Sequence, residues 1–93
     1  MFIRKIIRTD GSESNLDGIR SITEIADMLF ADSLHLVDLD DRIHIMLFND
    51  EAYFFKLPIN FKATEICNQK NPLKHHTIQG DVVIIPSQDL EHN

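Results

Sequence analysis

The chain has 93 residues, enough for one hydrophobic core, and only one cysteine, Cys67, so no intramolecular disulfide can support that core. Its apolar content of 43% is typical of a globular domain, and its formal charge of −6 opposes binding to a phosphate backbone, so nucleic acid is not an expected partner. Every apolar run is far shorter than the roughly 20 residues that span a bilayer, and no signal-peptide pattern occurs at the N-terminus. We therefore expect no membrane segment and a cytoplasmic location.

The first third of the chain predicts a strand and a helix. Residues 2–8 are rich in β-branched side chains and precede an Asp10-Gly11 turn, so they are expected to form a strand, with a polar loop over 12–18. Ser21 and Glu24 have the spacing of a capping box, which predicts that a helix begins there. The buried stripe of this helix is predicted at helical spacing by Ile22, Ile25, Ala26, Leu29 and Phe30.

Three strands are predicted next. Residues 34–39 and 43–48 are apolar segments separated by the turn residues Asp40-Asp41, which indicates a hairpin. Residues 52–57 are rich in aromatic side chains, which favours a third strand, and Pro58 ends it because proline cannot donate to a ladder. The three strands are expected to form a meander.

The last third predicts a helix and a buried strand. Asn60 is a good N-cap for a short helix through Cys67, followed by a polar, exposed loop over 68–76. The apolar run 82–85 is typical of a central strand. From Ser87 we expect a flexible tail, so the single domain is predicted over 1–86 and the tail over 87–93.

This order, β-α-β-β-β-α-β, predicts an α+β domain with a small, mainly antiparallel sheet and two helices on one face. The other face would then be open. It would carry apolar side chains such as Met46 and Phe48, which favours burial against a partner or a second copy, so a homo-oligomer is expected.

Residues for catalysis or cofactor binding are scarce. The three glycines form no phosphate-binding loop, and the cysteine and histidines lack the spacing of a zinc site, so no cofactor and no metal are expected. Asp38, Asp40 and Asp41 fit a solvated turn better than a cation loop. His75 and His76 are an adjacent pair expected in an exposed loop, where their role stays open. No nucleophile and base can be paired, so an enzyme is not predicted.

A candidate binding region brackets the aromatic segment. Polar turn residues lie before it and a helix start lies after it, so polar groups and apolar area are expected to converge. The alternative is structural, because Asn-Asp is ordinary turn chemistry and Asn60 is a helix cap. The predicted site residues are Asn49, Asp50, Glu51, Tyr53, Asn60 and Thr64.

Three pieces of the C-terminal half carry a family resemblance: Asn49-Asp50-Glu51, residues 57–64, and residues 78–84. On these pieces the segment 48–85 resembles an uncharacterised family of small proteins, a domain of unknown function encoded mainly by phages and prophages. The family tends to have an Asn-Glu pair where this chain has Asp50 inserted between Asn49 and Glu51, which leaves the equivalent acidic residue ambiguous.

The resemblance implies a small phage or prophage accessory protein that acts in the cytoplasm of a bacterial host cell. The function we expect is that of a binding module for a host or phage protein, such as an inhibitor of a host defence or regulatory protein. The alternative is a protein that binds and sequesters a small nucleotide-like signal.

Overall fold

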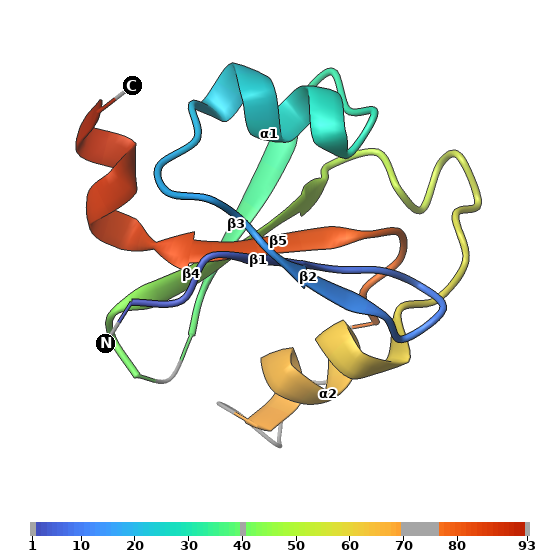
Figure 1. Ribbon diagram of the computed structural model, residues 1–93. Helices are drawn as coiled ribbons and strands as arrows, with labels where there is room; N and C mark the ends of the chain where they lie inside the picture. The colour runs from blue at the N-terminus through green and yellow to red at the C-terminus, as the bar shows by residue number, and fades with distance from the viewer. Residues whose placement is uncertain (1, 40, 70–76, 93) are drawn as a thin grey trace.

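The computed structural model describes residues 2–39, 41–69 and 77–92. Within them, one antiparallel sheet has the strand order β2-β1-β5-β4-β3 (Figure 1). The α+β class and the antiparallel sheet are thus confirmed. The elements are β1 (Lys5–Ile7), β2 (Glu13–Asn15), α1 (Ile22–Met28), β3 (Leu34–Asp38), β4 (His44–Asn49), α2 (Phe61–Gln69), β5 (Val82–Pro86) and the 3-10 helix η1 (Ser87–His92).

β5 is the central strand of the sheet, as predicted. It pairs with β1 through Val83 opposite Ile6, and with β4 through Ile84 opposite Met46. All five of its residues are buried. A strand that is buried on both faces requires a continuous apolar run rather than an alternating pattern.

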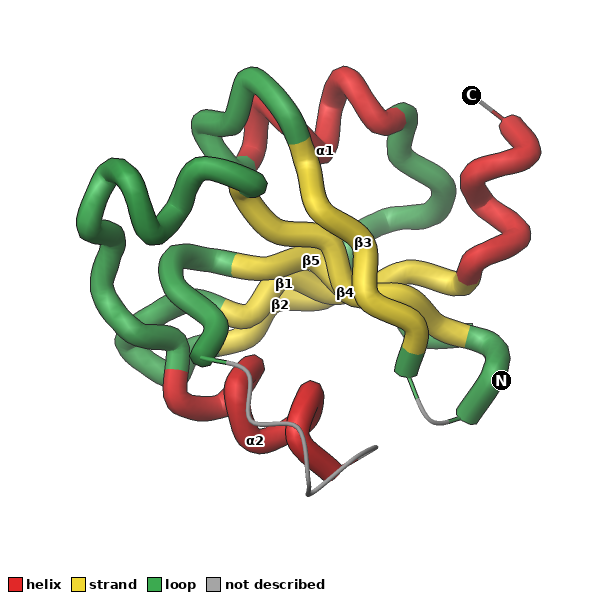
Figure 2. Tube along the Cα trace, turned by 180° about the vertical axis from the view of Figure 1, so that it is seen from behind, coloured by secondary structure: helices red, strands yellow, loops and turns green. Residues whose placement is uncertain are grey.

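The prediction that both helices cover one face is wrong. Figures 1 and 2 show α1 and α2 on opposite sides of the sheet, with η1 on the α1 side. The core is accordingly split in two. The α1 side contains Ile6, Ile25, Leu29, Ile45, Leu47, Val83 and Ile85. The α2 side contains Ile7, Met46, Ala63, Cys67, Ile78, Val82 and Ile84. The sheet therefore has no open face as large as the sequence analysis expected, because the central strands are apolar on both sides.

Helix α1 begins as the sequence predicts. The Ser21 hydroxyl accepts from the Glu24 amide at 3.1 Å, and the Ser21 amide donates to the Glu24 carboxylate at 3.2 Å. Ile25 and Leu29 are buried on the sheet. Phe30 is not part of this stripe, because the helix ends at Met28 and Phe30 turns outward with a φ of 53°.

Two predictions of local structure need correction. Residues 12–18 contain β2, which pairs with β1. Residues 51–56 form successive turns instead of a strand: the amides of Phe55, Lys56 and Leu57 donate to the carbonyls of Glu51, Tyr53 and Ala52. These short-range bonds consume backbone groups that a strand would offer to a neighbour, so the aromatic β-propensity of this segment is overridden. No three-strand meander forms, and β4 pairs with β5 instead.

The expectation of a flexible tail from Ser87 also needs correction, because this segment forms η1. Asp89 is fully buried and accepts two hydrogen bonds from the Arg4 guanidinium, at 2.8 and 3.0 Å. Leu90 packs against the α1-side core. The ordered domain therefore continues through η1, held by a bidentate ion pair that the sequence did not reveal.

Candidate functional site

Asn60, one of the predicted site residues, is a structural residue. Its side chain is only 1% exposed. Its amide nitrogen donates to the carbonyls of Ile7 and Gly80, each at 3.0 Å, and its carbonyl oxygen accepts from the Ala63 amide at 3.0 Å. It therefore caps α2, as predicted, and also fastens that helix to β1 and to the chain before β5. These bonds leave little of its hydrogen-bonding capacity for a ligand.

Thr64 is occupied in the same way. Its hydroxyl accepts from the Ile78 amide at 2.9 Å and lies 3.4 Å from the Ile78 carbonyl, to which it donates. Next to it, Ile59 and Gln79 form an isolated β-bridge. Together with Asn60, Thr64 thus attaches α2 to the segment 77–80.

The other four predicted residues differ in exposure: Asn49 is buried, Glu51 is half-buried, and Asp50 and Tyr53 are exposed. Asn49 is buried, and its side-chain oxygen accepts from the Glu51 amide at 2.9 Å, which is the predicted turn chemistry. Asp50 is exposed, with a carboxylate oxygen 3.7 Å from the His35 ring. Tyr53 projects into solvent. The structure therefore does not bring the six predicted residues together into one site.

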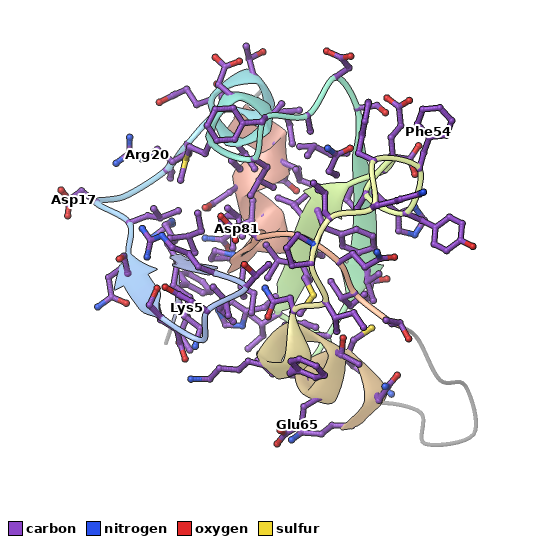
Figure 3. The ribbon with its side chains drawn as sticks, turned by 90° about the vertical axis from the view of Figure 1, so that its right-hand side faces the viewer. Lys5, Asp17, Arg20, Phe54, Glu65 and Asp81 are labelled. Atoms are coloured by element: carbon purple, nitrogen blue, oxygen red, sulfur yellow. The ribbon has the colours of Figure 1, made fainter. Side chains whose placement is uncertain are left out.

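What the structure gathers instead is a set of exposed aromatic side chains, which we call the crown: Phe30, Tyr53, Phe54 and Phe55. Their exposed fractions are 93, 85, 76 and 55%. Figure 3 shows Phe54 directed outward from the loop after β4. Phe54 and Phe55 meet edge to face, with ring centroids 5.4 Å apart. Exposed aromatic clusters of this kind mark interaction surfaces on soluble proteins.

A groove of about 440 Å³ lies beside the crown and shares two of its rings. Its lining is Thr9, Leu29, Phe30, Asn49, Phe55, Leu57, Pro58, Gly80 and Asp81. The volume is within the range of ligand pockets, and the lining is mainly apolar with a few polar groups, as such pockets usually are. Of the predicted site residues, only Asn49 lines this groove.

The polar end of the groove is acidic. One oxygen of Asp81 accepts from the Thr9 amide at 3.0 Å, and no further hydrogen bond of this carboxylate occurs within the described part of the chain. The lining contains no lysine and no arginine. Such a groove suits an apolar group with a nearby positive charge better than a phosphate.

Two residues at the crown have a backbone conformation that is unfavourable for side chains other than glycine. Phe30 has a φ of 53° and Lys56 a φ of 55°. Non-glycine residues in the left-handed region cost of order 1–3 kcal/mol and cluster at functional sites. At Phe30 the strained turn directs a large apolar ring into solvent, so burial of this ring contributes almost nothing to the stability of the fold.

A second constellation was not foreseen from the sequence. The His44 ring is buried between Asp41, whose carboxylate lies 2.5 Å from Nδ1, and the Ile3 amide, which donates to Nε2 at 2.8 Å. The Asp41 carboxylate also accepts from the amides of His44 and Ile43, both at 2.9 Å. These backbone bonds, and then the ring, lower the pKa of Asp41 to about 2.

An Asp–His pair can orient a general base, but this one has its second ring nitrogen occupied. Because Nε2 accepts from a backbone amide, Nδ1 carries the proton, and neither nitrogen is presented to a substrate. The pair therefore closes the β3–β4 turn and holds the N-terminal segment. A sequence signal did exist, since Asp41 and His44 are three residues apart at a turn.

Within residues 2–39, 41–69 and 77–92, no cluster of three or more His, Cys, Asp or Glu side chains is arranged to hold a metal ion. No helix of that part of the chain is long and apolar enough to cross a membrane. Cys67 is buried in the α2-side core, as predicted. His75 and His76 lie outside the described residues.

The sequence analysis missed Phe30 and misjudged Phe54 and Phe55 as strand residues. No local signal separated the two cases, because a run of consecutive apolar residues such as 53–55 also fits a strand that is buried on both faces. In comparisons with known proteins, no family model, curated protein or solved structure matches the chain. The family resemblance stays a prediction, and the crown with its groove is the feature of the described residues that bears on function.

Proposed function

We propose that this chain is a protein-interaction module that binds an apolar, positively charged segment of a partner protein through the crown and its groove. The observation that carries the proposal is the exposure of the four crown rings, of which even the least exposed, Phe55, has half its surface in water. Aromatic side chains are enriched at interfaces because they bury a large area at a low entropic cost.

The residues that line the groove support an apolar, positively charged segment as the part of the partner that binds. Phe30 and Phe55 offer ring faces to an aliphatic side chain or to the cation of a lysine or arginine. Asp81 offers a carboxylate oxygen at the polar end, and the chain as a whole carries a charge of −6. A basic partner would be attracted over a distance and then fixed by apolar contacts.

Binding is a better proposal than catalysis for this arrangement. The Asp41–His44 pair is fully used inside the fold, and the groove contains no paired nucleophile and base among its lining residues. In keeping with the phage resemblance, the partner we propose is a host or phage protein, with inhibition of a host defence or regulatory protein as the consequence of occupying its binding segment. Sequestration of a small nucleotide-like ligand is the competing proposal, and the absence of a cation in the groove lining weighs against it.

The test is a selection of random peptides on the immobilised protein, followed by titration of the enriched peptides against variants. We expect peptides with an aromatic or aliphatic residue next to lysine or arginine. Their dissociation constants should rise by about tenfold or more in Phe55→Ser and Phe30→Ser, the size of a typical hot-spot loss. Asp81→Asn should weaken the basic peptides and reduce their salt dependence.

The matched control is Phe61→Ser. Phe61 is 75% exposed on α2 and lies outside the crown and the groove lining, so it tests whether any exposed ring attracts peptides. The proposal is contradicted if Phe61→Ser weakens binding as much as Phe55→Ser does, or if the enriched peptides are acidic. A nucleotide panel is run in parallel, and thermal stabilisation that is lost in Phe55→Ser would favour the competing proposal.

A further inference from the structure

The two edges of the sheet differ in how they are protected. β2 is three residues long, and its Glu13 carboxylate pairs with Lys5 at 2.8 Å and with Lys62 of α2. β3 is five residues long and contains no proline, glycine or lysine. Figure 2 shows β3 at the near edge of the sheet, where no described strand lies beyond it. Proteins usually shorten, charge or cover such edges, because an unprotected edge pairs with another chain.

The backbone of β3 alternates between β4 and solvent. The Asp50 amide donates to the Ser33 carbonyl at 3.1 Å, and the Leu39 amide donates to the His44 carbonyl at 2.9 Å. These bonds place residues 33 and 39 in hydrogen-bonded pairs, so by alternation residues 35 and 37 also bond to β4. The amides and carbonyls of Leu34 and Leu36 therefore point away from β4, toward a position that a further strand would occupy.

We infer that this edge pairs with β3 of a second copy of the chain, antiparallel and centred on Leu36. In that register Leu36 lies opposite Leu36 of the partner copy, residue 34 opposite residue 38, and residue 35 opposite residue 37. In this register the outward amide and carbonyl of Leu36 meet those of Leu36 of the second copy. A register centred on residue 35 or on residue 37 would leave part of both strands unpaired.

Side chains fit the same register. Leu36 is 44% exposed in the single chain and would be covered by its counterpart across the two-fold axis. Each Asp38 lies opposite Leu34 of the other copy, so the two Asp38 carboxylates are kept about four residues apart along the strands, roughly 13 Å. The edge is thus compatible with itself in backbone direction, and the register keeps its like charges apart. The contact is small, so the dimer should be a reversible one that forms at high protein concentration.

The experiment is sedimentation of the full chain over a wide concentration range, with proline variants at the two edges. Leu36→Pro removes an amide hydrogen that points to solvent in the monomer, so it leaves the β3–β4 ladder intact and blocks the second copy. The matched control is Asn15→Pro. Asn15 lies on β2, and its amide points outward because residues 14 and 16 are the ones bonded to β1. We expect the dissociation constant of the dimer to rise by about tenfold or more in Leu36→Pro and to stay unchanged in Asn15→Pro.

A register test completes the design. Under mild oxidation, Leu36→Cys should form a disulfide between copies much faster than Leu34→Cys, because only position 36 faces itself. Leu36→Lys serves as a second blocking variant, and circular dichroism confirms that each variant is folded. The inference is overturned by a single-chain mass at every concentration, by a dimer that both Leu36 variants leave intact, or by equal disulfide formation at positions 34 and 36. None of these results depends on the crown, so the proposed function is tested separately.

Discussion

The segment from Asn49 to Thr64 has two halves that use their side chains in opposite ways. In the second half, Asn60 and Thr64 direct every described polar contact at the chain's own backbone and are buried or half-buried. In the first half, Tyr53, Phe54 and Phe55 direct large apolar rings into solvent. The comparison shows that neighbouring residues with equally suggestive side chains can differ completely in their surroundings: one half maintains the fold, and the other exposes the rings to which we propose that a partner binds.

The strongest test of this difference is Asn60→Ala. The change removes three hydrogen bonds and leaves the carbonyls of Ile7 and Gly80 without their buried donor. We expect the free energy of unfolding to fall by about 3 kcal/mol, since buried unsatisfied groups and a lost cap each cost of order 1 kcal/mol or more. Urea denaturation measures it, with Asn15→Ala on exposed β2 as the control. A loss below about 1 kcal/mol would mean that water replaces the missing side chain.

Gly80→Ala tests a contact with Leu57, a residue that lies between the two halves of the segment. Gly80 has a φ of 82°, and an added Cβ would lie 2.9 Å from the Leu57 Cδ1 atom in the groove wall. We expect a loss of about 1–2 kcal/mol from the left-handed conformation, plus a shift of Leu57. Gly18→Ala is the matched control, because Gly18 has a φ of 89° with open space around it. Equal losses in the two variants, measured by thermal denaturation, would show that the contact with Leu57 costs nothing.

Acid titration extends the comparison to a polar cluster outside the segment, the Asp41–His44 pair, whose side chains are also used inside the fold. Because the pKa of Asp41 is lowered to about 2 in the folded chain, its contribution to stability is present above its ordinary value of 3.8 and is lost as the pH falls toward 2. Asp41→Asn should therefore differ most from the wild type above pH 4, and the two should converge toward pH 2. Denaturation midpoints from pH 2 to 7 provide the measurement, with Asp17→Asn as a control for removing one charge. Parallel curves would rule out this contribution.

The smallest effect is expected at the crown. Phe54→Ser should change the free energy of unfolding by less than about 0.5 kcal/mol, because a largely exposed ring contributes little to the fold beyond its edge contact with Phe55. Binding of a hydrophobic dye should decrease at the same time. A large destabilisation would place Phe54 with Asn60 among the residues that maintain the fold, and it would remove the basis of the comparison.

Local signals in the sequence were sufficient for much of the fold. The capping box at Ser21, the cap at Asn60 and the run 82–85 depend on neighbours within a few residues, and the structure contains all three features. The placement of α2 depends instead on long-range packing of Met46, Val82 and Ile84 on the second face of the sheet. The sequence analysis expected the face that carries Met46 and Phe48 to be open, although a sheet that is apolar on both sides needs cover on both.

The candidate site was less predictable for a related reason. Asn60 has the same side chain whether it binds a ligand or bonds to Ile7, and the difference arises from a carbonyl 53 residues away in sequence. The crown likewise requires Phe30 to lie near the loop 51–58, a proximity that no local pattern encodes. Of the predicted site residues, Tyr53 belongs to the crown and Asn49 lines the groove, but the sequence did not separate the two halves of the segment.

The position of β5 has a consequence for how the chain folds. β1–β2 and β3–β4 are hairpins that close over short stretches of chain, yet neither hairpin pairs with the other, and β5 lies between them. Lys5 pairs with Ile84, and His44 with Pro86, so the sheet is completed only by contacts between residues 79 and 42 positions apart in sequence. High contact order of this kind slows folding, because loop-closure entropy must be overcome before the contacts form. Until residues 82–86 insert, the edges of β1 and β4 lack the strand that they pair with in the fold, and an unpaired strand edge can pair with another chain.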